Sequence, residues 1–108
     1  MPSEISADEL QAKLKSGKPV HLVDVRDPWE RAIAKLPDHQ HIPLGELPER
    51  MGELRAPKDS VLVIYCHHGV RSLAAAAFLE EQGVKGVVSL AGGIDAWAQR
   101  IDTTLPVY

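Results

Sequence analysis

The chain has 108 residues, of which 44% are hydrophobic and 25% are charged, and its formal net charge is -3. We expect one domain over residues 1–108 with a substantial core, and this composition is typical of a soluble globular protein. The slightly acidic balance gives no electrostatic support to nucleic-acid binding, and no run approaches the roughly 20 apolar residues that a membrane-spanning helix needs.

The N-terminus and the cysteine content predict the cellular setting. Residues 1–5 have neither a basic start nor an apolar core, so we expect no signal peptide. Cys66 is the only cysteine, which excludes an internal disulfide and a cysteine-rich zinc site. A reducing, cytoplasmic environment is the simplest interpretation. The sequence does not predict whether the chain forms oligomers.

The first third of the chain predicts a helix, a strand and a second helix. Ser6 and Glu9 have the spacing of a capping box at a helix start. Residues 20–25 predict a short strand. Residues 27–28 are Asp and Pro, the types favoured at the N-cap and first position of another helix, and Pro37 is expected to end that helix.

The rest of the chain continues the alternation. Residues 41–44 contain a proline, which favours an edge strand or an extended link over a central strand. The remaining predicted elements are a short helix over 47–54, a turn at 57–59, a strand over 61–65, a helix over 73–81, a strand over 87–90 and a helix over 94–101. Strands that alternate with helices predict an α/β fold with an open parallel sheet and helices on both faces.

This sheet predicts where a functional site lies. In open α/β sheets, sites lie beyond the C-terminal strand ends, and three informative stretches follow predicted strands, namely residues 24–27, 66–72 and 91–95. The middle stretch leads from Cys66 into an alanine-rich helix, so it directs backbone N–H groups and the positive helix end into a small cradle. Arg71 adds a fixed positive charge. We therefore expect an activated Cys66 thiolate over an anion-binding loop.

Each of these residues also has a plainer interpretation. A free cysteine such as Cys66 is often a small buried hydrophobe. Arg71 near a helix start can pair with a carboxylate, although the helix dipole disfavours a cation there, which favours anion binding. His67 and His68 are adjacent on a tight loop and have no third ligand at a suitable spacing. We expect them to line the pocket mouth or face solvent and to bind no metal.

Asp24 and Arg26 are predicted to support the loop rather than to react. Asp24 stands at a strand end, where it can accept hydrogen bonds that hold the loop in shape. Arg26 can pair with Glu30 across one helical turn or with another acid. The two tryptophans, Trp29 and Trp97, are expected to pack rather than to bind substrate.

Three blocks of sequence carry a resemblance to a known family. They are residues 22–27 (LVDVRD) with Trp29-Glu30 after them, residues 66–72 (CHHGVRS) and residues 90–97 (LAGGIDAW). In this order they resemble the motifs of the single-domain rhodaneses, which are sulfurtransferases, and they cover most of the chain. Asp38 and His39 stand where that family usually has Gly-Ala, which concerns the local loop shape more than the chemistry.

The resemblance implies a thiosulfate sulfurtransferase of the rhodanese type. Cys66 would be the catalytic residue: its thiolate takes a sulfane sulfur from a small anionic donor such as thiosulfate, and the persulfide passes it to cyanide, a thiol or a thiol protein. The substrate-binding residues would be those of the loop, His67, His68, Gly69, Val70, Arg71 and Ser72. The resemblance implies no cofactor and no metal.

Two other functions stay open, and a third is disfavoured. The fold can serve as a non-catalytic binding or redox-sensing module, or it can relay persulfide to a dedicated protein partner. Phosphatase activity is disfavoured because four residues separate Cys66 from Arg71, whereas the related cysteine phosphatases have one more, which makes a wider cradle for phosphate. Tyr65 also stands where those enzymes commonly have histidine.

Overall fold

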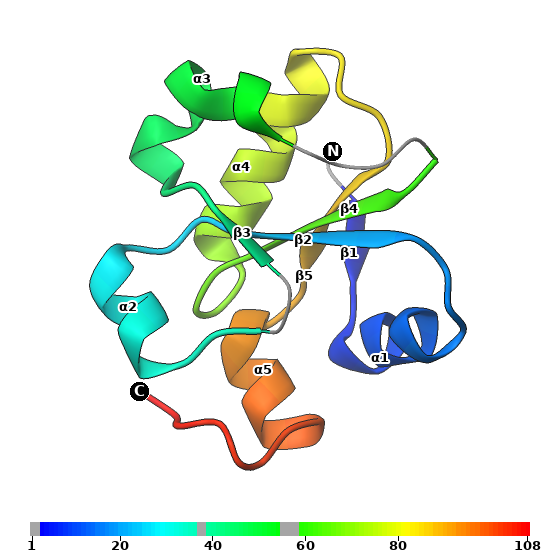
Figure 1. Cartoon of the computed structure of the whole chain (residues 1–108), viewed down its shortest axis with the longest axis vertical. Coiled ribbons are helices and arrows are strands. Elements are labelled where there is room, and N and C mark those ends of the chain that lie inside the picture. The colour runs from blue at the N-terminus through cyan, green and yellow to red at the C-terminus, as the bar shows by residue number, and fades with distance from the viewer. Residues whose placement is uncertain (1–2, 37–38, 55–58) are drawn as a thin grey trace.

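The fold is a five-stranded parallel sheet with helices on both faces (Figure 1). The computed structural model describes residues 3–36, 39–54 and 59–108. The strands are β1 (Ser3–Ile5), β2 (Val20–Asp24), β3 (His39–His41), β4 (Val61–Tyr65) and β5 (Val87–Leu90). Their order in the sheet is β1-β5-β4-β2-β3, and each of these pairings is parallel. The predicted α/β class is therefore confirmed.

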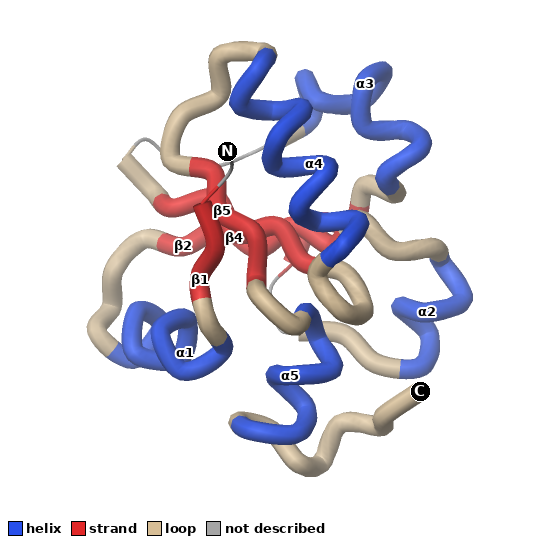
Figure 2. The backbone as a smooth tube through the Cα atoms, turned by 180° about the vertical axis from the view of Figure 1, so that it is seen from behind, coloured by secondary structure: helices blue, strands red, loops and turns tan. Residues whose placement is uncertain are grey.

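The helices lie in two layers, which Figures 1 and 2 show from opposite sides. One layer holds α1 (Ala7–Lys15) and α5 (Gly93–Arg100), and the other holds α3 (Leu47–Arg50) and α4 (Val70–Glu81). Short 3-10 turns flank α3, namely η1 (Leu44–Glu46) and η2 (Met51–Glu53), and α2 (Pro28–Ile33) lies near the C-terminus. Within the described ranges, no helix is long and apolar enough to cross a membrane.

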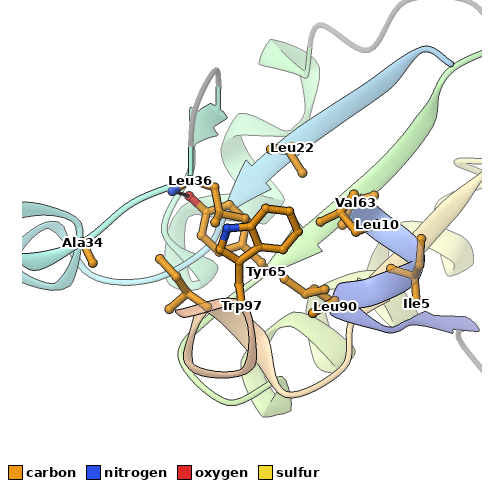
Figure 3. Close-up of a cluster of buried hydrophobic side chains, with 11 residues drawn as sticks. Ile5, Leu10, Leu22, Ala34, Leu36, Val63, Tyr65, Leu90 and Trp97 are labelled. Atoms are coloured by element: carbon orange, nitrogen blue, oxygen red, sulfur yellow. Dashed lines mark hydrogen bonds between the residues drawn. The ribbon is translucent and has the colours of Figure 1, made fainter. Parts of the chain in front are cut away.

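Two apolar clusters form the core, one on each face of the sheet. The first joins the strands to α1 and α5 (Figure 3) and includes Ile5, Leu10, Leu22, Val63, Tyr65, Leu90 and Trp97. The second packs against α3 and α4 and includes Val23, Leu47, Ile64, Cys66, Ala75, Ala76 and Leu79. Because side chains alternate along a strand, Val63 and Tyr65 face one layer while Ile64 and Cys66 face the other. Cys66 is thus directed toward α4.

The predicted helix starts at Ser6 and Asp27 are confirmed. The Ser6 hydroxyl accepts a hydrogen bond from the Glu9 N–H at 3.1 Å, and the Glu9 carboxylate accepts one from the Ser6 N–H at 3.0 Å. Asp27 is the N-cap of α2, and its N–H donates to the Glu30 carboxylate at 3.0 Å. Both starts follow from local sequence, because a capping box satisfies N–H groups that the helix leaves free.

Two elements differ from the prediction. β1 is an additional strand at the edge of the sheet; only Ile5 of its three residues is buried, so it has almost no hydrophobic pattern. α4 begins at Val70 rather than at Leu73, so the last three residues of the predicted loop form its first turn. Gly69 serves as its N-cap without a side-chain hydrogen bond, so the usual N-cap signal is missing there.

The predictions for the region around β3 are confirmed in part. β3 is an edge strand, as predicted, but it covers His39–His41 rather than residues 41–44. α2 ends at Ile33, and Ala34 is already extended, so the prediction that Pro37 ends this helix is wrong. Residues 37–38 and 55–58 lie outside the described residues, which leaves the predicted effect of Asp38 and most of the turn at 57–59 without a structural account.

Candidate active site

The stretches that follow β2, β4 and β5 meet at one end of the sheet, as predicted. Three backbone hydrogen bonds join them: Val25 N–H to Tyr65 O at 3.1 Å, Ile94 N–H to Cys66 O at 2.8 Å, and Asp95 N–H to His67 O at 3.1 Å. The first bond ties the end of β2 to the end of β4, and the other two tie the start of α5 to the loop. The candidate site is therefore built by residues 24–27, 66–72 and 91–95 together.

Cys66 lies at the bottom of this site, directly after β4. The residue is 1% exposed, and its Sγ accepts hydrogen bonds from the N–H groups of Gly69 at 3.1 Å and Ser72 at 3.3 Å. Its Sγ also lies 3.5 Å from the Ser72 hydroxyl oxygen. Cys66 is thus both a buried residue of the core and a sulfur held by polar groups, and two amides directed at one sulfur stabilise an anion there.

Ser72 is held in place by a residue that the sequence prediction did not select. Its hydroxyl donates to the Gly69 carbonyl at 3.2 Å and shares a hydrogen bond of 2.7 Å with the hydroxyl of Ser89 in β5. Ser72 and Ser89 are both fully buried. A serine inside the apolar strand run at 87–90 was the available signal, because a buried hydroxyl needs a polar partner.

Two glycines allow the loop and α5 to approach each other closely. Gly69 and Gly93 have φ angles of +102° and +61°, which side-chain-bearing residues rarely adopt. A Cβ atom at Gly93 would lie only 2.4 Å from the carbonyl oxygens of both Cys66 and His67. The contact between α5 and the Cys66 loop therefore requires glycine at position 93.

Arg71 is engaged by a carboxylate, the alternative that the sequence prediction ranked second. Its guanidinium donates to the two Glu30 oxygens at 2.6 and 2.7 Å. The Glu30 side chain is 3% exposed and that of Arg71 is 34% exposed. The hydrogen bond from Arg71 lowers the pKa of Glu30 to about 2, so Glu30 carries a full negative charge near neutral pH. The structure thus pairs Arg71 with a carboxylate and leaves about a third of its side chain exposed, and its anion-binding role stays a prediction.

Asp24 and Arg26 form a fully buried ion pair. The Arg26 Nε donates to Asp24 Oδ1 at 2.9 Å, and Nη2 donates to Oδ2 at 2.8 Å. Burial by itself lowers the pKa of Arg26, but the hydrogen bonds and charge of Asp24 outweigh it and raise the pKa overall. Arg26 was predicted to pair with Glu30 or with another acid, and the acid that it pairs with is Asp24. The Asp24 carboxylate accepts hydrogen bonds from the backbone N–H and the guanidinium of Arg26, and that it supports the Cys66 loop stays a prediction.

Tyr108 completes the polar network, and sequence reasoning missed it. Its hydroxyl accepts a hydrogen bond from Arg26 Nη1 at 2.7 Å and donates one to Glu30 Oε1 at 2.9 Å. Its ring stacks on the His67 ring with a centroid distance of 3.9 Å, and Trp29 meets it edge-on at 6.0 Å. Trp29, which was expected to pack rather than to bind substrate, packs edge-on against Tyr108 while 60% of its surface stays exposed. The expectation for Trp97 is confirmed, because that ring is buried.

Within the loop, His68 and Val70 are exposed and His67 is half-buried, and that they line a pocket mouth stays a prediction. Val70 is 78% exposed, and the two imidazole rings stack with a centroid distance of 3.8 Å. Asp95 brings a third possible ligand atom, and the ligand atoms of His67, His68 and Asp95 lie within 4.8 Å of one another. The argument that no third ligand is near is therefore wrong.

A cavity of about 660 Å³ lies elsewhere on the molecule. It is lined by β1, by the first residues of β4 and β5, and by residues of α1 and the end of α4, including Ile5, Glu9, Val61, Glu80 and Val87. No residue of the 66–72 loop lines this cavity. The position of the candidate active site therefore follows from the Cys66 sulfur and the charged groups near it, and not from the position of this cavity.

Comparison with known proteins gives consistent matches along the chain. Residues 6–100 match the family model described as the Rhodanese-like domain. A protein of Allochromatium vinosum named sulfurtransferase is 43% identical over 92% of this chain and 91% of its own length. The probable adenylyltransferase/sulfurtransferase MoeZ of Mycobacterium tuberculosis is 38% identical over 98% of this chain, which spans 27% of that protein. The crystal structure of a rhodanese-like domain protein from Staphylococcus aureus superimposes with a TM-score of 0.81 at 34% identity, covering 98% of each chain.

Proposed function

Because this chain belongs to the rhodanese-like family, we propose that it is a sulfurtransferase that carries sulfur as a persulfide on Cys66. The observation that supports this most directly is the pair of N–H donors at 3.1 and 3.3 Å from the Cys66 sulfur. Amides in this position stabilise a negative charge on sulfur, whether it belongs to a thiolate or to a persulfide. The A. vinosum relative is itself named a sulfurtransferase.

The proposed cycle has two displacements at sulfur. The Cys66 thiolate attacks the sulfane sulfur of a donor such as thiosulfate; a new S–S bond forms, the donor's S–S bond breaks, and sulfite leaves with the electron pair. An acceptor then attacks the outer sulfur of the persulfide. Cyanide becomes thiocyanate, or a thiolate becomes a new persulfide, and the Cys66 thiolate is restored. Each step is balanced without a redox partner.

The other site residues have supporting roles in this proposal. The N–H groups of Gly69 and Ser72 stabilise the charged sulfur. Val70 and His68 are exposed on the loop and contact the incoming donor or acceptor. Arg71 faces the donor while it is paired with Glu30. Arg26, which is paired with Asp24, donates hydrogen bonds to the Glu30 carbonyl in α2 and to the Tyr108 hydroxyl, so it joins α2 to the C-terminal residues.

Intact-mass spectrometry under non-reducing conditions tests the proposal. After exposure to thiosulfate, the wild-type chain is expected to gain the mass of one sulfur atom and to lose it again on addition of cyanide. The chain has no second cysteine, so a Cys66→Ser variant is the control and is expected to gain nothing. If no gain occurs with thiosulfate or with other sulfane donors, the chain is a binding or redox-sensing module instead.

Replacing Arg71 with alanine is expected to reduce kcat/KM for thiosulfate at least about tenfold. The variant loses a charged hydrogen-bonding group, typically about 1.5–3 kcal/mol, and it leaves the buried Glu30 carboxylate facing an anionic donor. Steady-state kinetics with thiosulfate and cyanide measure the loss, with circular dichroism as the control for folding. Unchanged kinetics in a folded variant would remove Arg71 from the site.

A further inference from the structure

The position of the Glu30 carboxylate is fixed by hydrogen bonds from Arg71 and from two further donors. Its Oε1 accepts from Arg71 at 2.7 Å and from the Tyr108 hydroxyl at 2.9 Å, while its Oε2 accepts from Arg71 at 2.6 Å and from the Asp27 N–H at 3.0 Å. Both oxygens therefore have two donors each. The carboxylate cannot turn away to release the guanidinium without losing several of these bonds.

The arrangement matches each guanidinium of the site with a carboxylate. Arg26 is paired with Asp24, and Arg71 with Glu30. Asp95 adds a further carboxylate on the start of α5, with its Oδ2 3.9 Å from His68 Nε2. The remaining positive character that the loop offers is the N-terminus of α4, which is equivalent to about half an elementary charge. A partial positive charge of this size balances a donor with one negative charge better than it balances a donor with two.

We propose that Glu30 is a specificity-determining residue, which makes the site favour sulfur donors that carry one negative charge over dianionic donors such as thiosulfate. This inference rests on the proposed sulfurtransferase function. A dianion approaching Arg71 is attracted by the guanidinium and repelled by Glu30 behind it, so the pair contributes little net attraction. Singly charged donors include thiosulfonates, R–SO2–S⁻, and the persulfide anions of small thiols.

The chemistry of the two donor types is otherwise the same. With a thiosulfonate, the Cys66 thiolate takes the terminal sulfur, the S–S bond of the donor breaks, and the sulfinate R–SO2⁻ leaves with the electron pair. With thiosulfate the leaving group is the dianion sulfite. The comparison therefore changes the charge on the donor and leaving group while keeping the bond made and the bond broken.

The test compares kcat/KM for thiosulfate and for methanethiosulfonate, at low ionic strength with cyanide as acceptor. Glu30→Gln removes the carboxylate charge and keeps the side-chain shape. We expect it to raise the ratio of thiosulfate to methanethiosulfonate efficiency about tenfold. Glu81→Gln is the matched control: it makes the same charge change on an exposed residue at the end of α4, about 15 Å along the helix from Arg71. It is expected to change the ratio less than about twofold.

The outcomes separate this inference from the function on which it rests. If Cys66 gains sulfur from both donors but Glu30→Gln leaves their ratio within about twofold of wild type, the inference is wrong and the function stands. If the variant loses both donors equally, Glu30 is only a structural support, and the inference is again wrong. If neither donor loads the wild-type chain, the proposed function itself fails.

A second measurement needs no substituted protein. Sulfate and methanesulfonate are unreactive anions of two charges and one charge, and each is tested as an inhibitor of methanethiosulfonate use by the wild-type chain. We expect methanesulfonate to inhibit at least as strongly as sulfate. Sulfate inhibition stronger by about tenfold would overturn the proposal even if the Glu30→Gln variant did not fold.

Discussion

Replacing Cys66 with alanine is expected to abolish sulfur transfer while the chain stays folded. The sulfur is the proposed point of covalent attachment, and in enzymes with covalent catalysis the loss of the nucleophile typically reduces kcat by a factor on the order of a thousand or more. Alanine is smaller than cysteine and apolar, so it fits the buried position beside Ile64 and α4 without a clash. The thiocyanate assay with a saturating donor measures the loss.

The control for this variant is its thermal unfolding. The two amides that hold Sγ lose their partner, and a small cavity forms, so we expect a destabilisation of about 1 kcal/mol, the usual size for a point substitution. A folded Cys66→Ala chain with activity near that of wild type would show that the proposed persulfide site is wrong. No other residue of the chain is a cysteine, so no second thiol can account for residual transfer.

Replacing Arg26 with alanine is expected to have the largest effect on stability. The variant leaves the Asp24 carboxylate buried without its ionic partner, since both side chains are fully buried. Breaking a buried ion pair from one side typically costs about 3–5 kcal/mol. The substitution also removes the donor to the Tyr108 hydroxyl. A loss of this size is a large part of the stability of a small domain.

Urea unfolding followed by circular dichroism measures this effect, with Arg100→Ala as the matched control. Arg100 also pairs with an aspartate, Asp8, but both of those side chains are more than half exposed. Exposed pairs contribute little because water screens them, so the control is expected to unfold close to wild type. Equal losses in the two variants would contradict the importance that we assign to the buried pair.

The sequence predicted the elements whose signals are local. The capping box at Ser6, the N-cap at Asp27 and the apolar strand runs lie within a few residues of the structure that they determine. These signals also sufficed to bring Cys66 next to the ends of the neighbouring strands, because a parallel sheet places all C-terminal strand ends at one edge. β1 has only Ile5 as a buried residue, so its pairing with β5 decides its structure rather than its own pattern.

The charge environment of the site could not be predicted in the same way. Glu30 and Arg71 are 41 residues apart, and Tyr108 lies 78 residues from Glu30. No spacing rule connects residues at such separations, so Arg71 looked like an open cation. The same reason explains why Ser89, 17 residues from Ser72, was not selected. Sequence reasoning found the sulfur and its loop, while the partners that set the charge of the loop come from distant parts of the chain.

The hydrogen bonds from α5 to the Cys66 loop reduce the reorganisation that the loop needs in each catalytic cycle. With the carbonyls of Cys66 and His67 fixed by amides of α5, the peptide planes beside the sulfur keep their orientation while sulfur arrives and leaves. Dipoles that are already oriented need no reorganisation when charge develops, whereas water would have to reorient. The conformational entropy of the loop is lost when the chain folds, so every catalytic cycle begins from a preorganised loop. Disorder in α5 would therefore impair transfer even if every residue of the loop were present.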